Sequence, residues 1–324
     1  MRIDNRMATS IKVIVPGGLN TDIIGLGVER LLGQGELTLG GTLRIGPGGK
    51  ARNMAQMAAA YLGKNQVAMI GRTAQDPLGL WKIPLESLRR AGVNTAFVKK
   101  LSASQAGGKY PGIALIPVDK NGKNQIYVLP GINRDFCRRD IDRAAPLFQS
   151  PTVKVLLLAL EIPLVTAQYA VELAHRHGIK VVLDPGGIRS SIGSLLRKNI
   201  FLLKPNEHEA RILSGITIQD LASAQRAARS IMRHGVENIL ITHGAKGAYF
   251  FTGTTGCHIP APRLKHGALR DETGCGDQVT AILAACLAEG KGLAEAARLA
   301  VRAGTMQFYR SGIQPITKKE LLNG

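Results

Sequence analysis

Short apolar runs alternate with longer segments in which apolar residues recur at helical spacing along most of this chain. Runs such as VLLLAL at 155–160 are continuously apolar, as in parallel strands that helices cover on both faces. The pattern predicts core strands at 11–18, 66–71, 153–160, 179–185, 200–206 and 237–244. It predicts helices at 51–63, 163–178, 221–235, 275–290 and 293–309, several of them ending in glycine. This alternation favours an α/β fold with three layers, α/β/α, around a mostly parallel central sheet.

Two glycine-rich stretches, at about 20–46 and about 96–134, interrupt the alternation. They contain the β-like runs ELTLGGTLRI (36–45), GIALIPV (112–118) and NQIYVLP (124–130), and the last two flank DKNG, a plausible hairpin turn. We interpret both stretches as a small β lid inserted into one domain that spans residues 1–324. Two extra hairpins at the sheet edge are the alternative interpretation.

The composition is that of an ordinary globular protein, with 45% hydrophobic and 20% charged residues in 324. No run approaches the roughly 20 apolar residues that a membrane span needs, and MRIDNRMATS at the start lacks the apolar core of a signal peptide. The four cysteines form no CxxC pair. We therefore expect a cytoplasmic protein with reduced thiols and no membrane partner.

The net charge of +19 favours anionic ligands, because summed positive potential concentrates anions. The basic residues are scattered, and aromatic residues make up only 4% of the chain. A nucleic-acid interface usually needs a basic cluster or a stacking platform. The charge therefore predicts a small anionic substrate rather than nucleic acid.

Ligands of open α/β sheets bind beyond the carboxyl ends of the strands, so polar residues in those turns are the candidates for a site. GGLNTD (17–22) places Asn20 and Asp22 two residues apart, where they could receive hydroxyl groups or serve as ordinary turn residues. GPGGKARN (46–53) places Gly49, Lys50 and Asn53 at a helix start, where amide donors favour polar ligands. The same stretch fits a relaxed GxGxxA dinucleotide pattern, but no acidic residue ends a strand about 20 positions later, which argues against an NAD-dependent oxidoreductase.

Two further stretches lie at predicted helix starts. In LKPNEHEA (203–210), Asn206 and Glu209 share a face and could meet a hydrated Mg²⁺, although an N-cap with first-turn acids has the same pattern. In DETGCGDQV (271–279), two glycines flank Cys275 ahead of Asp277 and a long apolar run. Helix N–H groups there should face an anion, with Asp277 as a candidate base. The same amides predict a lowered pKa and raised reactivity for the Cys275 thiol, alkylation of which should inactivate the protein.

Taken in order, these stretches resemble the motifs of the ribokinase-like (PfkB) family of carbohydrate and nucleoside kinases. The resemblance rests on the following segments: GGLNTD, GGKARNMAQMAAAYLG (48–63), IGRTAQDPLG (70–79), NGKNQIYVLPGIN (121–133), LEIP (160–163), LDPGGIR (183–189), KPNEHEA, ITHGAKGAYFF (241–251) and DETGCGD. The last is similar to the family signature DTxGAGD, and the motifs as a whole are closest to those of the ribokinases.

The resemblance implies a role for each matching residue. Asp277 would be the general base that takes the proton of the attacking sugar hydroxyl, and Gly274, Cys275 and Gly276 would form the anion hole. Sugar hydroxyls would be held by Asn20, Asp22, Gly49, Lys50, Asn53 and Glu161. The cofactors would be ATP and Mg²⁺, with Asn206 and Glu209 ordering Mg²⁺ through water and Thr242, Gly244 and Gly247 binding the nucleotide. Asp271 and Thr273 would lie at a site for a monovalent cation, usually K⁺.

The sequence departs from the family pattern in the same regions. Cys275 stands where the family usually has alanine, Glu272 replaces a threonine, and KYPGIA (109–114) stands where a Thr-Gly pair is frequent. Ile316 replaces a small polar residue of the cation site, and His243, inside the nucleotide motif, has no assigned role. Dependence on K⁺ is therefore a separate question from kinase activity.

The resemblance implies transfer of the γ-phosphate of ATP to a primary hydroxyl of a small sugar, with D-ribose, giving ribose 5-phosphate, as the leading candidate. A nucleoside, fructose or ketodeoxysugar is the alternative substrate, and a non-catalytic sugar- or nucleotide-sensing protein is the alternative of another class. The lid has an exposed edge, which predicts a homodimer through lid pairing. Lid closure should also exclude water from the reaction.

Overall fold

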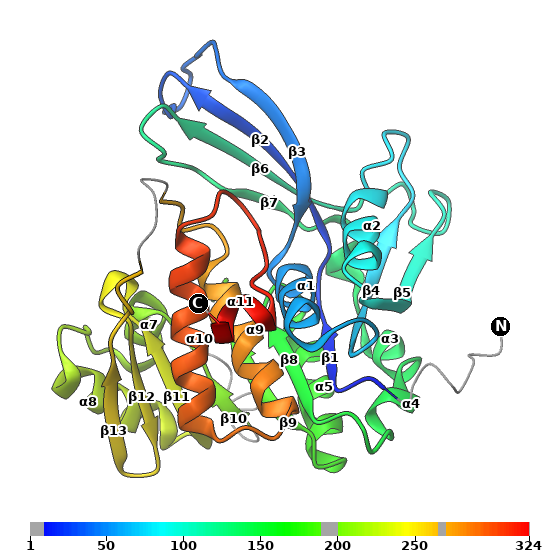
Figure 1. Ribbon diagram of the computed structural model, residues 1–324. Coiled ribbons are helices and arrows are strands. Elements are labelled where there is room, and N and C mark those ends of the chain that lie inside the picture. Colours follow the sequence, from blue (N-terminus) through cyan, green and yellow to red (C-terminus); the bar gives the residue numbers. More distant parts are fainter. Residues whose placement is uncertain (1–9, 189–199, 265–269, 324) are drawn as a thin grey trace.

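The computed structural model describes residues 10–188, 200–264 and 270–323. Most of MRIDNRMATS, and Arg189 at the end of LDPGGIR, therefore lie outside the described residues. The described residues form one large sheet and one small sheet (Figure 1). The large sheet has nine strands, in the order β13 (Thr255–Ile259), β12 (Ala248–Thr252), β11 (Val236–Thr242), β10 (Ile200–Leu203), β9 (Lys180–Asp184), β8 (Val155–Ala159), β1 (Val13–Pro16), β4 (Val67–Ala74) and β5 (Asn94–Leu101).

The large sheet is parallel from β5 to β11, and β12 and β13 add an antiparallel edge. All the predicted core strands are present, which confirms the α/β fold. The pattern of apolar residues did not predict β5, β12 or β13. The outermost of these, β13, is mostly exposed and thus lacks the apolar run on which such a prediction depends.

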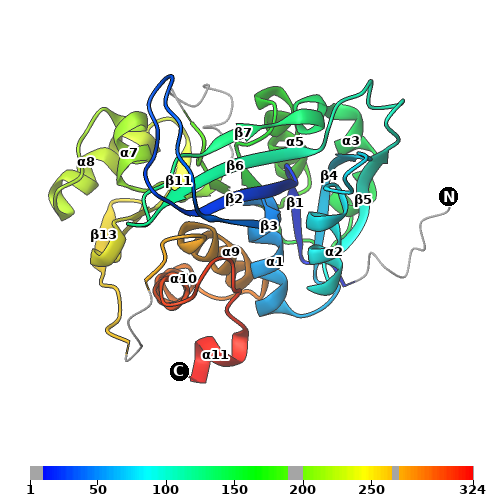
Figure 2. The same ribbon diagram turned by 90° about the horizontal axis from the view of Figure 1, so that it is seen from above.

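Helices cover both faces of the large sheet, because alternate residues of each strand point to opposite sides. In β1, Val13 and Val15 pack into one core cluster and Ile14 into the other. Figure 2 shows the two helical layers on either side of the sheet. The first layer contains α1 (Lys50–Leu62), α2 (Lys82–Arg90), α9 (Cys275–Ala288), α10 (Leu293–Phe308) and α11 (Lys318–Asn323). The second contains α3 (Arg138–Asp142), α4 (Ala145–Phe148), α5 (Leu164–Arg176), α7 (Glu207–Ser214) and α8 (Leu221–Met232).

The small sheet is the lid, and it extends above the carboxyl ends of the main strands (Figure 1). Its order is β3 (Thr42–Gly48), β2 (Asn20–Val28), β6 (Gly112–Asp119) and β7 (Tyr127–Leu129). The predicted hairpin around DKNG is the antiparallel pair β6 and β7. The second lid segment begins later than the predicted residue 96, because 94–101 pair with β4 in the large sheet.

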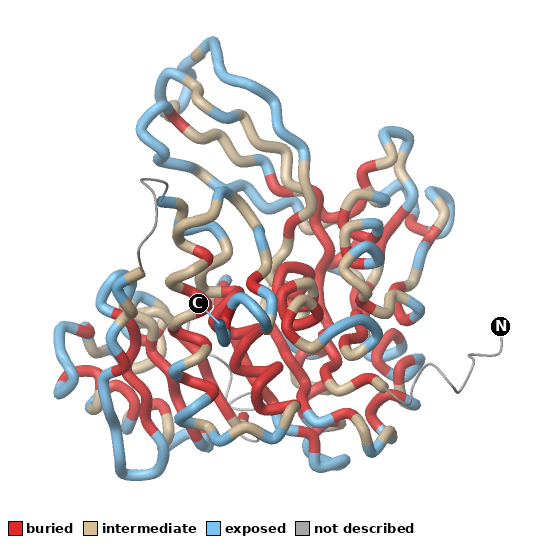
Figure 3. Tube along the Cα trace, in the orientation of Figure 1, coloured by how far each residue is buried: buried red, intermediate tan, exposed pale blue. Residues whose placement is uncertain are grey.

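The lid is far more exposed than the main domain, as Figure 3 shows by colour. In β2, β3 and β6 the buried residues are those at the ends that join the main domain, together with Asp119 at the far end of β6. Among the described residues, no helix is long and apolar enough to cross a bilayer.

Candidate active site

Asp277 lies in the first turn of α9 and is 5% exposed. Its Oδ2 accepts a hydrogen bond from Nδ2 of Asn53 at 2.7 Å, and its Oδ1 lies 3.4 Å from Nζ of Lys50. Both partners come from the first turn of α1, more than 220 residues away in the chain. The fold thus brings the predicted base and two predicted substrate residues together in one site.

The start of α1 also binds Glu161, which follows β8. Oε2 of Glu161 accepts a hydrogen bond from the backbone N–H of Lys50 at 2.9 Å. Burial raises the pKa of Glu161 to about 7, although the positive charge of Lys50 acts in the opposite direction. The pKa of Lys50 is raised, mainly by the carboxylate of Asp277 and then by that of Asp184. Lys50 therefore stays an ammonium among several carboxyl groups.

The lid contributes Asn20 and Asp22 from the first residues of β2. Oδ1 of Asn20 accepts a hydrogen bond from Nδ2 of Asn133 at 2.8 Å, so its amide is held in one orientation. Burial raises the pKa of Asp22 to about 6, opposed by the nearby guanidinium of Arg52. Gly48 in β3 makes room for this carboxyl, because a Cβ there would lie 1.8 Å from Oδ1 of Asp22. The negative charge of Asp277 also acts to raise the pKa of Asp22, so these two carboxyl groups lie in one electrostatic neighbourhood.

The glycines before Asp277 shape the N-terminus of α9. Gly274 is the N-cap in the left-handed region, with φ of 75°. The N–H of Cys275 donates to the carbonyl oxygen of Glu272 at 3.2 Å. The N–H groups of Gly276 and Asp277 follow in the first turn, where helical donors have no intrahelical acceptor. A concentration of donors at this point suits an incoming anion.

A buried ion pair lies beside these donors. Nζ of Lys204 is 2.7 Å from Oδ2 of Asp184, and it would lie 3.3 Å from a Cβ at Gly276. Oδ2 of Asp184 also accepts a hydrogen bond from the hydroxyl of Thr280 in α9 at 2.9 Å. Burial acts to raise the pKa of Asp184, but the ammonium groups of Lys204 and Lys50 outweigh it and lower that pKa to about 2. Asp184 thus holds the Lys204 ammonium next to the predicted anion hole at the start of α9.

The model of the pfkB family of carbohydrate kinases matches residues 10–319 of this chain. The chain belongs to the pfkB family. It is similar to a ribokinase of Haemophilus influenzae, with 31% identity over 93% of each chain. It is also similar to a deoxyribokinase of Salmonella typhi, with 32% identity over 75% of each chain. The structure of Arabidopsis thaliana ribokinase complexed with ribose and ATP superposes with a TM-score of 0.84, at 26% identity over 97% of this chain and 98% of that one. As a pfkB carbohydrate kinase the protein is a phosphotransferase with an alcohol group as acceptor.

The residues implied for Mg²⁺ and nucleotide lie at the ends of neighbouring strands of this pfkB kinase. Asn206 and Glu209 form a reciprocal capping box at the start of α7, with hydrogen bonds of 2.9 and 2.8 Å. Thr242, at the end of β11, bridges to Asn206. Gly244 and Gly247 bound the turn η3 (Gly244–Lys246), and both have positive φ, which favours glycine. A Cβ at Gly247 would lie 2.1 Å from the carbonyl oxygen of Ile259, so the tight turn requires glycine there.

The donor set around Asn206 and Glu209 fits Mg²⁺ that arrives with a nucleotide. Burial raises the pKa of Glu209, and the negative charge of Asp184 acts in the same direction, which places both carboxyl groups in one electrostatic neighbourhood. Within the described ranges, no cluster of three or more His, Cys, Asp or Glu side chains could hold a metal by itself. Mg²⁺ usually keeps several waters and is bound through one or two carboxylates plus phosphates, as this arrangement allows.

The prediction of a reactive Cys275 was wrong. Burial raises the pKa of its thiol to about 12, and the carboxylates of Asp271, Glu272 and Asp277 act in the same direction. The proximity of helix-start amides suggested the opposite shift, but the loss of hydration and the three nearby acids outweigh the effect of those amides. The sulfur contacts the carbonyl oxygen of Asp271 at 3.6 Å.

Sequence reasoning missed several residues that support the site. Arg52 is fully buried and donates to the side chain of Asn53, which orients the amide that faces Asp277. Asn133 and the Asp184–Lys204 pair were likewise missed, although all four residues lie inside quoted motifs. Asp184 and Lys204 could have been found from the sequence, because each is a charged residue at the end of an apolar strand. No sequence signal indicated that Arg52 would point inward.

Proposed function

We propose that this protein transfers the γ-phosphoryl group of ATP to the primary hydroxyl of D-ribose, giving ribose 5-phosphate. The observation that carries the proposal is the position of the Asp277 carboxylate, which is hydrogen-bonded to Asn53 and faces both the lid residues and the N-terminus of α9. In this proposal the hydroxyl anchors come from the lid and α1, and the anion donors from the start of α9. A sugar kinase needs this juxtaposition, because the attacking oxygen must meet both the base and the phosphoryl group.

In the proposed reaction Asp277 accepts the proton of the attacking hydroxyl. The bond from that oxygen to the γ-phosphorus forms while the bond from phosphorus to the β–γ bridging oxygen breaks, and ADP leaves. The N–H groups of Gly276 and Asp277 and the ammonium of Lys204 stabilise the charge on the transferred group. Mg²⁺, bound through waters near Asn206 and Glu209, would neutralise phosphate charge when it is present.

The sugar would lie between the lid and α1. Asn20, Asp22 and Glu161 would receive ring hydroxyls, and a buried hydroxyl partner left unpaired costs about 1–3 kcal/mol, enough to discriminate between sugars. 2-Deoxyribose is the second candidate, because the Salmonella typhi relative with 32% identity is named a deoxyribokinase. 2-Deoxyribose lacks one hydroxyl of ribose, so it would lose only the contacts that this hydroxyl makes.

The Asp277→Asn variant tests the assigned base. A general base contributes about 10²–10⁴-fold, so ADP release with saturating sugar should fall by about that factor, whereas binding of ATP should persist. Turnover within a few-fold of the unchanged protein would show that Asp277 is not the base. Binding of sugar or nucleotide without turnover in the unchanged protein would instead indicate a sensing protein.

A panel of substrates assayed for ADP release tests the choice of sugar. It contains ribose, 2-deoxyribose, fructose, a ketodeoxysugar and nucleosides, each at several concentrations. Ribose should give the highest kcat/KM, and a higher value for any other compound would replace it as the substrate.

The exposed apolar residues of the lid support a homodimer formed through lid pairing. On β3, Leu43 is 71% exposed, and on β7 Tyr127 and Leu129 are more than half exposed. Exposed apolar patches of this kind usually mark an interface. We also propose that residues 1–324 act as one domain whose lid closes over the sugar and excludes water. Light scattering that gave the monomer mass at micromolar concentration would contradict the dimer.

A further inference from the structure

Gln307, near the end of α10, is fully buried behind the anion hole. Its Nε2 donates to two backbone carbonyl oxygens, that of Gly312 at 2.6 Å and that of Thr273 at 3.3 Å. One of these carbonyls belongs to the turn that leads into Gly274, and the other to the loop after α10. A single side-chain amide therefore ties both segments together directly behind the N-terminus of α9.

The neighbouring carboxylate is also engaged by backbone donors. Oδ1 of Asp271 accepts from the N–H of Thr273, and Oδ2 accepts from the N–H of Gly312, both at 2.8 Å. The positive charge of Arg44 also acts on this carboxylate. The carboxylate is thus stabilised as an anion by groups of the chain itself.

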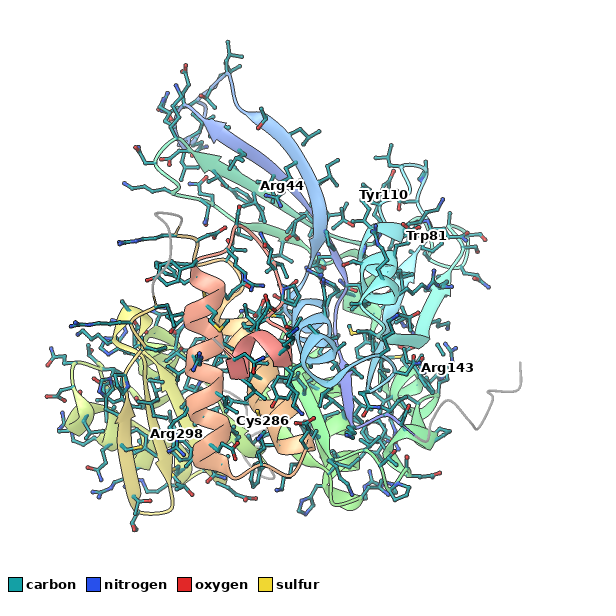
Figure 4. The ribbon with its side chains drawn as sticks, in the orientation of Figure 1. Arg44, Trp81, Tyr110, Arg143, Cys286 and Arg298 are labelled. Atoms are coloured by element: carbon teal, nitrogen blue, oxygen red, sulfur yellow. The ribbon has the colours of Figure 1, made fainter. Side chains whose placement is uncertain are left out.

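The lid supplies the positive charge at this point. Arg44, labelled in Figure 4, belongs to β3, and its Nη2 would lie 3.4 Å from a Cβ at Gly312. A guanidinium next to Asp271 disfavours a second cation there by charge repulsion. Ile316 is fully buried nearby and offers only an apolar side chain.

These residues do not fit the monovalent cation that the family resemblance implies at Asp271 and Thr273. An alkali cation binds through several oxygen atoms at once, whereas both carboxylate oxygens of Asp271 and the carbonyls of Thr273 and Gly312 already accept from N–H donors. Oε1 of Gln307 is buried without a hydrogen-bond partner among the described residues, and one such oxygen is too few to coordinate a cation. The amide of Gln307 presents two hydrogens and no net charge. With Nε2 toward the carbonyls both of them are satisfied, whereas the flipped amide would set its own oxygen against theirs.

We propose that the Gln307 amide takes the place of the monovalent cation, holding the 271–274 turn to the loop at 310–316 so that the anion hole keeps its shape without K⁺. Gln307 is a positioning residue in this proposal, because it acts on the phosphoryl group only through the backbone of residues 273–276. The proposal rests on the anion hole of the proposed function. It does not depend on which sugar is the substrate.

The experiment compares the unchanged protein, Gln307→Ala and Gln314→Ala in chloride salts of K⁺, Na⁺ and tetramethylammonium at one ionic strength. Gln314 is the matched control, since its amide donates to the carbonyl of Ser311 in the same loop but does not reach Thr273. The unchanged protein and the control should show rates of ADP release within about two-fold across the salts. Gln307→Ala should lose about ten-fold in tetramethylammonium, as expected for two partly buried carbonyls without a donor, and regain part of the rate in K⁺.

Thermal unfolding without sugar or nucleotide gives a readout that needs no turnover. K⁺ should raise the Tm of Gln307→Ala by several degrees relative to Na⁺ and leave that of the unchanged protein the same. More than ten-fold activation of the unchanged protein by K⁺, or a K⁺-specific rise in its Tm, would overturn the proposal. If no sugar is phosphorylated, the proposed substrate fails while the Tm comparison still decides the role of Gln307.

Discussion

Replacing Lys204 with methionine would test the buried ion pair beside the proposed anion hole. Lys204 and Asp184 are 3% and 0% exposed, and their charged atoms lie 2.7 Å apart. The substitution keeps the length of the side chain and removes its charge. Asp184 would retain hydrogen bonds from the Thr280 hydroxyl at 2.9 Å and the Gly186 N–H at 2.8 Å.

The expected loss follows from what remains around Asp184. Removing one partner of a buried pair costs about 3–5 kcal/mol, because a buried charge is left uncompensated. The two remaining hydrogen bonds and the charge of Lys50 place this case at the lower end, at about 3 kcal/mol of the free energy of unfolding. The kcat should fall as well, since the lost ammonium lies beside Gly276.

Urea denaturation at pH 7 measures the loss, and a double-mutant cycle assigns it. Asp184→Asn combined with Lys204→Met should recover about 2 kcal/mol relative to the sum of the single variants. Lys318→Met is the control, because its pair with Glu289 has the same 2.7 Å separation but is more exposed, at 42% and 19% of the two side chains, and it should cost less than about 1 kcal/mol.

The dependence of stability on pH gives a further check. The folded pKa of Asp184, about 2, lies below the ordinary value of 3.8. Its stabilising contribution is therefore complete above about pH 4 and is lost only as the pH falls toward 2. A loss below 1 kcal/mol for Lys204→Met, or the absence of recovery in the double variant, would refute the reasoning.

Three further predictions concern the sugar side of the site and the anion hole. The raised pKa of Glu161, about 7 against 4.5, means that the folded state holds its proton more tightly, so the free energy of unfolding should fall as pH rises from about 4.5 to 7. Glu161→Gln should reduce this slope in urea titrations, and the part that remains comes from the raised pKa values of Asp22 and Glu209. Gly48→Ala should raise the KM for sugar about ten-fold by displacing Asp22, whereas Gly46→Ala on the same strand, where a Cβ meets open space, should leave it unchanged in steady-state assays. Cys275, with a pKa of about 12, should react with iodoacetamide at pH 7.5 much more slowly than free glutathione, and equal rates by mass spectrometry would contradict the assigned burial of the thiol.

Local patterns in the chain were sufficient to predict the main elements. Continuous apolar runs predicted the buried strands, and helical spacing predicted α1, α5, α8, α9 and α10 to within about two or three residues at most ends. A strand that is buried on both faces has a continuous apolar run, and a helix that is buried along one face has apolar residues at helical spacing. Both patterns can be seen in residues that are close together in the chain. The edge strand β13 lacks such an apolar pattern, because all but its last residue are exposed.

The motifs also predicted which turns gather polar residues, because parallel strands place their carboxyl ends at one edge of the sheet. Which atoms meet there was decided by tertiary structure alone. Asn53 reaches Asp277 across 224 positions, and Asn133 reaches Asn20 across 113. No local pattern encodes such a pairing, since each partner is an ordinary residue of its own helix or turn.

The electrostatics of the site shows most clearly what the sequence predicted and what only the tertiary structure decided. The residues DETGCGD predicted where the helix donors and the candidate base would lie, and amides at a helix start suggested an activated thiol at Cys275. Burial and three nearby carboxylates instead raise the pKa of that thiol. The amide of Gln307 donates to the carbonyls of Thr273 and Gly312, a pairing that the sequence did not predict. Sequence thus determined the fold and the place of the site, whereas hydration, charge and hydrogen-bond partners depended on segments that only the folded chain brings together.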